Sequence, residues 1–89
     1  MMTKREELEK FCRGEGCLYK IDEDEPVFVL RGQDKFYVPL VRLWIELVEM
    51  ATQNPPSAAT AAKLMDAVEN ANYAIDWQNA HPDRVKVPD

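Results

Sequence analysis

Residues 38–51 read VPLVRLWIELVEMA, and this stretch decides the fold class. Ten of its fourteen residues are apolar, and the pattern predicts a helix over residues 38–53. A surface helix needs an apolar arc of little more than about 100°, whereas this one is apolar over roughly two-thirds of its circumference. Its polar residues fall in one narrow stripe at helical spacing: Arg42, Glu46, Glu49 and Gln53.

The apolar surface of this helix predicts self-association. A chain of 89 residues offers one other long helix and a short β unit to cover it. A domain of this size buries only about 60% of the surface that its unfolded chain exposes, so a partner would stabilise it. We therefore expect a dimer or a larger homo-oligomer; the alternative is a monomer in which this helix is the central element. The candidate interface residues are Val41, Trp44, Ile45 and Val48.

A second long helix is predicted over residues 58–79. Asn54-Pro55-Pro56 interrupts the chain, and Ser57 follows as the N-cap residue. Alanine is frequent in this helix, and small side chains permit two helices to approach closely, so the two long helices are expected to form a helical hairpin. The predicted apolar stripe consists of Ala61, Leu64, Met65, Val68, Ala71 and Ile75.

The N-terminal third of the chain predicts a short helix over residues 4–13. Thr3 and Glu6 match a capping box, in which the Thr side chain and the Glu side chain satisfy each other's backbone N–H groups. Gly14 and Gly16 end the helix.

Two β-prone stretches follow, at residues 17–21 and 27–31. The acidic run and Pro26 between them are typical of a turn, so residues 17–31 are expected to form an antiparallel β-hairpin. The predicted fold class is therefore α+β and mainly helical. A single small domain is expected over residues 1–80, followed by an extended C-terminal tail over residues 81–89.

The charge balance bears on the class of partner. The chain has 11 Lys and Arg against 16 Asp and Glu, a net charge of −5. Nucleic acids and anionic lipids are bound through clustered cations, so we expect neither as a direct partner. No apolar run reaches the length of about 18 residues that a membrane span requires. The charged N-terminus lacks the apolar region of a secretory signal, and the protein is expected in the cytoplasm, that of the host cell if a phage encodes it.

Side chains for catalysis are scarce. The single histidine, His81, lies in the polar tail, where we expect it to be solvated, and three glycines do not make a phosphate-binding loop. Cys12 and Cys17 lack the second pair of ligands that a zinc site needs. We expect both as reduced thiols, one of them partly buried. The sequence thus predicts a protein that is not an enzyme and holds no metal or cofactor.

A small anionic ligand is one candidate partner. Basic and aromatic residues gather around the start of the first long helix, and Tyr73 and Trp77 lie one turn apart on the second with amides beside them. An equally open interpretation pairs Arg31 with Asp34 and Arg42 with Glu46, and covers the two aromatic rings with the N-terminal helix or the β-hairpin. The candidate ligand-binding residues are Arg31, Lys35, Tyr37, Arg42, Asn72, Tyr73 and Trp77.

A basic host protein is the other candidate partner. Four consecutive acids form the tip of the predicted hairpin: Asp22, Glu23, Asp24 and Glu25. Electrostatic complementarity of this kind raises the rate and the selectivity of association. The alternative is an ordinary solvated loop.

Two resemblances extend this interpretation. The segment PVFVLRGQD at residues 26–34, the residues Val41, Arg42 and Trp44, and KVPD at residues 86–89 resemble small proteins encoded by bacteriophages and prophages, a group that implies no particular chemistry. The last long helix, with Lys63-Leu64, Ala67, Ala71-Asn72 and Ala74-Ile75, resembles the closing helix of phage sponges. Members of that family sequester cyclic nucleotide signals of bacterial immunity between the subunits of a homo-oligomer.

The sponge resemblance implies a helical hairpin preceded by a short helix. It covers only the last helix, and the predicted β-hairpin departs from the family's pattern, so no binding residue is carried over. Together these observations predict a phage-type interaction protein that counteracts a host system by binding. It would capture a cyclic nucleotide, or instead act as an acidic inhibitor or adaptor, for example like an anti-CRISPR, or as a structural accessory protein of a phage.

Overall fold

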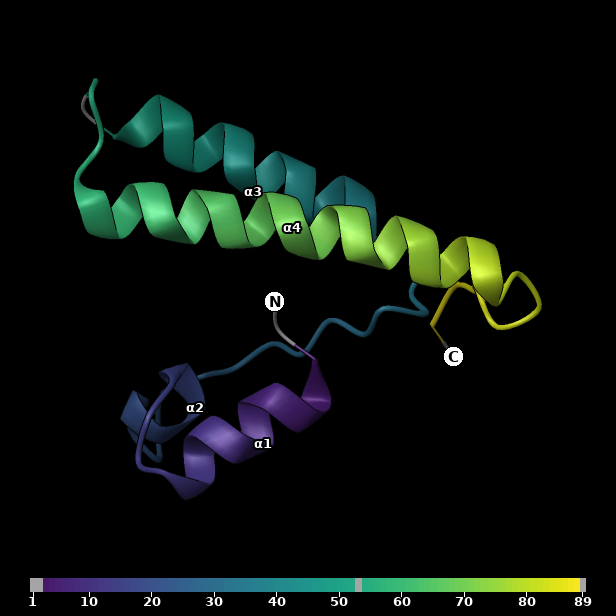
Figure 1. Cartoon of the computed structure of the whole chain (residues 1–89), viewed down its shortest axis with the longest axis horizontal. Coiled ribbons are helices and arrows are strands. Elements are labelled where there is room, and N and C mark those ends of the chain that lie inside the picture. Colours follow the sequence, from purple (N-terminus) through teal and green to yellow (C-terminus); the bar gives the residue numbers. More distant parts are fainter. Residues whose placement is uncertain (1–2, 53, 89) are drawn as a thin grey trace.

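The computed structural model of the chain describes residues 3–52 and 54–88, and the regular secondary structure in these ranges is helical (Figure 1). Gln53 of the predicted polar stripe and Asp89 of the predicted tail lie outside the described residues. Within those ranges no strand forms, so the predicted α+β class is wrong. The helices are α1 at Lys4–Cys12, α2 at Cys17–Lys20, α3 at Tyr37–Ala51 and α4 at Ala58–Ala80.

The two long helices pack side by side as the predicted antiparallel hairpin (Figure 1). Ser57 caps α4 as predicted, because its Oγ accepts a hydrogen bond from the backbone N–H of Thr60 at 3.2 Å. Alanine lines the contact with α3, and the absence of long side chains there allows the helices to approach closely. The buried residues of the hairpin are Val38, Ala67, Asn70, Ala71 and Ala74.

This buried stripe differs from the predicted one. Met65 and Val68, predicted to face the core, are exposed, whereas Ala67 and Ala74 are buried. The buried positions repeat at helical spacing along the alanine-rich side of α4, because that side brings the two backbones closest. The larger side chains of Met65 and Val68 therefore lie away from the contact.

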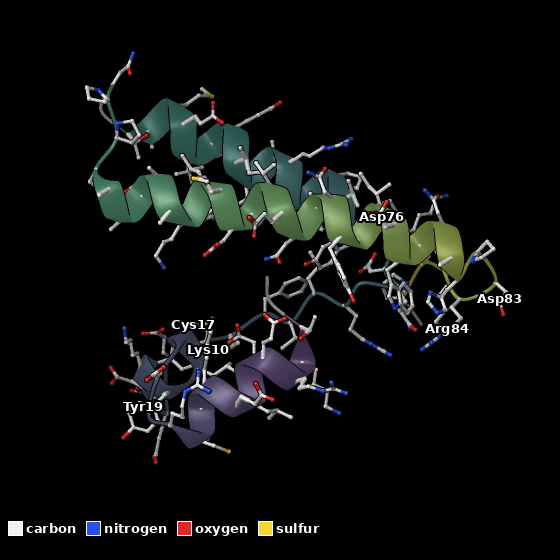
Figure 2. All side chains as sticks on the ribbon, in the orientation of Figure 1. Lys10, Cys17, Tyr19, Asp76, Asp83 and Arg84 are labelled. Carbon is white, nitrogen blue, oxygen red and sulfur yellow. The ribbon has the colours of Figure 1, made fainter. Side chains whose placement is uncertain are left out.

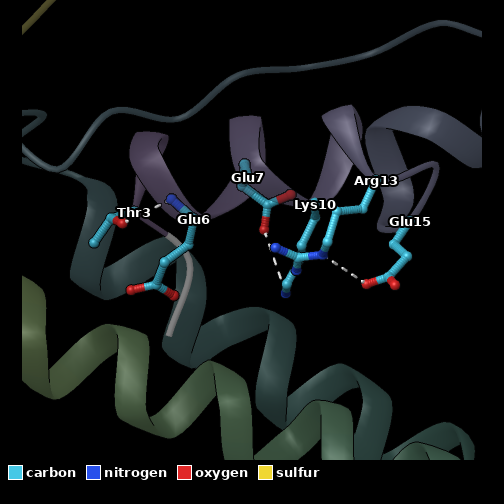
Figure 3. A network of polar contacts seen from close by, with 6 residues as sticks. All are labelled: Thr3, Glu6, Glu7, Lys10, Arg13 and Glu15. Atoms are coloured by element: carbon cyan, nitrogen blue, oxygen red, sulfur yellow. Dashed lines mark hydrogen bonds and ion pairs between the residues drawn. The ribbon is translucent and has the colours of Figure 1, made fainter.

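Helix α1 begins as the capping residues predict. Thr3 Oγ1 accepts a hydrogen bond from the backbone N–H of Glu6 at 3.3 Å, and the helix ends at Cys12. Gly14 follows with a φ of 72°, a left-handed conformation that glycine adopts without steric cost. Two ion pairs lie along α1 and just after its end. Glu7 pairs with Lys10 at 3.9 Å, and Arg13 pairs with Glu15 at 3.4 Å (Figure 3).

The predicted β-hairpin at residues 17–31 is wrong. Cys17–Lys20 forms the single helical turn α2, which folds back on α1 and brings the ring of Tyr19 to 5.9 Å from that of Phe11, edge to face. An isolated two-stranded hairpin is marginal in water. The helical turn is favoured over a strand for two reasons. Tyr19 packs on α1, and residues 17–21 form helical hydrogen bonds.

The helices form two separate pairs. Helix α1 packs on α2 and α3 packs on α4, and within the described residues no helix of one pair contacts a helix of the other. The segment between α2 and α3 crosses this gap as an extended connection (Figure 1). The radius of gyration is 14.4 Å, against about 12 Å expected for a compact domain of this length.

The C-terminal tail returns along the start of α3. Lys86 forms an isolated parallel bridge with Asp34, in which the backbone N–H of Lys35 donates to Lys86 O at 2.8 Å and the N–H of Lys86 donates to Gln33 O at 3.1 Å. The tail therefore ties the connection between α2 and α3 to the end of α4. None of the helices in the described residues combines the length and the apolarity needed to cross a membrane.

Candidate functional site

The outward side of α3 carries a row of exposed apolar side chains, which we call the α3 outer stripe. Its members repeat every three or four residues, so they line one side of the helix. This arc adjoins the half-buried side of α3 and is distinct from the polar stripe. No other helix in the described residues packs on α3 besides α4. The α3 outer stripe consists of Leu40, Leu43, Trp44, Leu47 and Met50.

The four predicted interface residues divide between two sides of α3. Val41, Ile45 and Val48 are half-buried, and because α4 is the only helix that packs on α3, their burial comes from the hairpin itself. Trp44 belongs to the α3 outer stripe and is exposed. Sequence periodicity located the apolar surface of this helix, but the direction of α4 was needed to divide it into an inner and an outer half.

The segment just before α3, where the basic and aromatic candidates for an anion site gather, forms a tight turn. Asp34 Oδ1 accepts a hydrogen bond from the backbone N–H of Phe36 at 2.7 Å. Arg31 is exposed and forms no ion pair with Asp34. It lines a depression of about 270 Å³ together with Val29, Gln33, Asp34, Lys86 and Pro88.

The remaining basic and aromatic candidates do not converge. Lys35 and Arg42 are exposed, and Arg42 lies on the polar stripe of α3 without the predicted ion pair to Glu46. Tyr37 is half-buried in the first turn of α3, and burial raises the pKa of its hydroxyl above the ordinary value of 10.0, because the neutral form is favoured away from water. Tyr37 is thus partly a packing residue.

Trp77 is covered by the tail and not by the N-terminal helix or a β-hairpin. The His81 ring stacks on the indole at a centroid distance of 4.3 Å. Arg84, labelled near the end of α4 in Figure 2, brings its guanidinium to 5.0 Å from the indole centroid. His81 Nδ1 also lies 2.8 Å from the backbone oxygen of Trp77. His81 is therefore half-buried, and its predicted solvated state is wrong.

The predicted aromatic platform is consequently split. Trp77 already stacks within the protein, whereas Tyr73, one turn earlier, is exposed. Asn72 is exposed, and the neighbouring Asn70 is buried in the hairpin. The contact of the tail with Trp77 could have been suspected from the spacing of Trp77 and His81, which places the two rings one helical turn apart.

Next to Trp77, Gln78 connects α4 to the start of α3. Its side-chain Nε2 donates hydrogen bonds to the backbone oxygens of Gly32 at 2.9 Å and Asp34 at 3.1 Å. These two bonds and the bridge of Lys86 to Asp34 hold the junction on the end of the hairpin. Gln78 was not among the predicted site residues.

The acidic run Asp22 to Glu25 is exposed along its whole length. It forms a turn closed by the backbone N–H of Glu25 and the oxygen of Asp22 at 3.1 Å, between α2 and the extended connection. The four carboxylates are thus available to solvent, although at the end of a helical turn and not at a hairpin tip. Cys12 and Cys17 are not bridged, and both are exposed, so the expected partial burial of one is wrong.

Within residues 3–52 and 54–88, no three His, Cys, Asp or Glu residues come together as a metal site would require. Comparison of the chain with protein-family models, with curated proteins and with solved structures finds no match. The α3 outer stripe gathers five exposed large apolar side chains on one helix.

Proposed function

We propose that this chain is a non-enzymatic interaction protein whose working unit is a homo-oligomer, with copies joined through the α3 outer stripe. The observation that carries the proposal is the exposure of large apolar side chains at helical spacing on α3. Contiguous exposed apolar surface on a small soluble chain is typical of a protein–protein interface.

The accessible surface supports this proposal quantitatively. The chain exposes 7248 Å², whereas a compact monomer of 10.3 kDa exposes about 5,350 Å². The excess is about 1,900 Å² per chain, and the copies in an obligate homodimer each bury about 1,000–2,500 Å². An interface of that size would cover the excess, which supports association of two copies.

The partner that this assembly engages is proposed to be a basic protein of a bacterial host. The exposed acids Asp22 to Glu25 and the net charge of −5 favour a basic surface. The resemblance of residues 26–34 and 86–89 to phage-encoded proteins suggests an infected cell as the setting, and inhibition of a host component by binding as the outcome.

Sedimentation of the wild-type chain and of Leu47→Glu tests the self-association. We expect the wild type to sediment as a dimer or larger at micromolar concentration. Leu47→Glu would bury an unpaired charge at the contact, and should raise the dissociation constant about 100-fold or more. Leu47 is exposed in the single chain, so helicity by circular dichroism should be retained.

Ala62→Glu is the matched control, since it introduces the same side chain at an exposed position of α4. It should leave the dissociation constant within about threefold of the wild type, because isolated surface substitutions have small effects. A wild type that remains a 10.3 kDa monomer, or an equal effect of the two variants, would contradict the proposal.

A second candidate is capture of a cyclic nucleotide between subunits. The observation that favours it is the depression of about 270 Å³ in which Arg31 and Lys86 both take part. Thermal unfolding in the presence of a panel of cyclic nucleotides tests it, since a ligand at 100 times its dissociation constant stabilises the native state by about 2.7 kcal/mol. If a nucleotide raises the unfolding temperature of the wild type but not that of Arg31→Ala, the site is supported. If no nucleotide raises the unfolding temperature of the wild type, this candidate is ruled out.

A further inference from the structure

The connection between α2 and α3 contains an apolar segment without a partner. Val27, Phe28 and Val29 have 54%, 84% and 76% of their surface exposed. Within the part of the chain that the structure describes, the backbone groups of Val27 through Leu30 form no hydrogen bond. Figure 1 shows this part of the chain as an extended trace that crosses the gap between the two helix pairs.

An extended apolar segment with unpaired backbone groups is a template for strand pairing. We propose that residues 26–30 pair in antiparallel fashion with the same residues of a second copy, about a two-fold axis at Phe28, with Glu25 and Arg31 facing each other at the ends. This contact deepens the proposed self-association and rests on it, but it lies on a segment separate from the α3 outer stripe.

The register centred on Phe28 gives each residue a complementary partner on the second copy. It places Val27 opposite Val29, Pro26 opposite Leu30 and Glu25 opposite Arg31, and the two-fold axis repeats each pair. Apolar residues then face apolar residues, and an acid faces a base at both ends, which stabilises a cross-strand pair.

Neighbouring registers lose this complementarity. An axis at Val27 would place Glu25 opposite Val29 and Asp24 opposite Leu30. An axis at Val29 would place Val27 opposite Arg31. Each of these registers sets a charged side chain against an apolar one, so charge complementarity selects the axis at Phe28.

The backbone of Pro26 fits the same register. If the two Phe28 residues form a pair without mutual hydrogen bonds, the alternation of an antiparallel ladder makes Val27 and Val29 the hydrogen-bonded pair. Pro26 and Leu30 then form the next pair without mutual bonds. The N–H that Pro26 lacks is therefore not required.

Among the described residues, the tail of the same chain forms no backbone hydrogen bond with this segment. It reaches the connection at Asp34 and Lys86, and a parallel ladder continued toward Leu30 would need Pro82 as the facing residue. Pro82 lies in the turn after α4 and has no N–H to donate. Because the described part of the tail cannot pair with this segment, we take the pairing strand from a second copy.

Disulfide trapping tests the register. In a background of Cys12→Ser and Cys17→Ser, Phe28→Cys should form a covalent dimer on mild oxidation, because directly opposed residues of a pair without mutual hydrogen bonds have Cα atoms about 4.5 Å apart. Val27→Cys is the matched control: its copies are offset along the ladder by more than the roughly 7 Å that a disulfide spans. A mixture of Val27→Cys with Val29→Cys should cross-link.

Charge reversal provides a second measurement. Glu25→Lys and Arg31→Glu should each weaken the dimer about tenfold in sedimentation, and the double variant should restore wild-type affinity to within about threefold. A dimer in which Phe28→Cys and Val27→Cys trap equally, or in which neither traps, would overturn this inference and leave the contact at α3 standing. A monomeric wild type would overturn both proposals.

Discussion

The carboxamide of Gln78 in α4 donates a hydrogen bond to the backbone oxygen of Gly32, 46 positions earlier in the chain, at 2.9 Å. A second bond reaches Asp34 O at 3.1 Å. The backbone bonds of Lys86 with Gln33 and Lys35 join the same segments, whereas within the described residues the N-terminal helix pair does not touch the α3–α4 hairpin. This side chain is therefore central to how the connection meets the hairpin.

Gln78→Ala is expected to lower the free energy of unfolding by about 1–2 kcal/mol, since two hydrogen bonds to partly buried carbonyls are lost. Denaturant unfolding measures the change. The control is Asn79→Ala, at the next position and exposed, which should stay within about 0.5 kcal/mol of the wild type. Equal values for the two variants would show that the bonds of Gln78 contribute nothing to stability.

Trp77→Ala is expected to destabilise the chain by about 2 kcal/mol, roughly half of what a fully buried tryptophan costs. The indole is half-buried and holds His81 and Arg84 against the end of α4. Tyr73→Ala, one turn away and exposed, should cost less than about 1 kcal/mol. If Tyr73→Ala proved the more damaging of the two, the assignment of Trp77 to packing would be incorrect.

Alkaline pH is expected to destabilise the chain through Tyr37. Burial raises the pKa of this hydroxyl in the folded state above the value of 10.0, so the unfolded chain loses the proton first. The stabilising contribution is complete below pH 10.0 and is lost as the pH rises from there through the folded-state pKa. Tyr37→Phe should show a smaller loss of unfolding free energy over this range.

The alkaline experiment compares unfolding curves of Tyr37→Phe with those of Tyr73→Phe, in which the hydroxyl is removed from an exposed ring. The two variants share every ionisable group except these two tyrosines, so the contribution of the shared groups cancels in the difference. Identical alkaline slopes in the two variants would mean that burial of Tyr37 is not linked to stability.

Local signals predicted the helices well. The caps at Thr3 and Ser57 and the break at Asn54-Pro55-Pro56 depend on neighbouring residues, and α1, α3 and α4 begin and end within two residues of the predicted bounds. Residues 17–20 were the exception. Their β propensity predicted a strand, but the edge-to-face contact of Tyr19 with Phe11 accompanies a helical turn that packs on α1.

The candidate site was less predictable because burial depends on distant segments. Periodicity alone did not separate Val41, Ile45 and Val48 on the inner side of α3 from Trp44 on the outer side. The tail that covers Trp77 was expected to be extended, and no pattern in residues 81–89 indicated that Arg84 would lie against the indole.

By itself, the amino-acid sequence determined where the long helices run and that Ser57 caps the second of them. These properties follow from helical periodicity and composition. The tertiary structure decided which side of α3 stays exposed, that Arg84 lies against Trp77, and that residues 26–30 have no strand partner among the described residues. Those outcomes depend on how far apart the two helix pairs lie, and contacts between distant segments are not encoded in any local pattern.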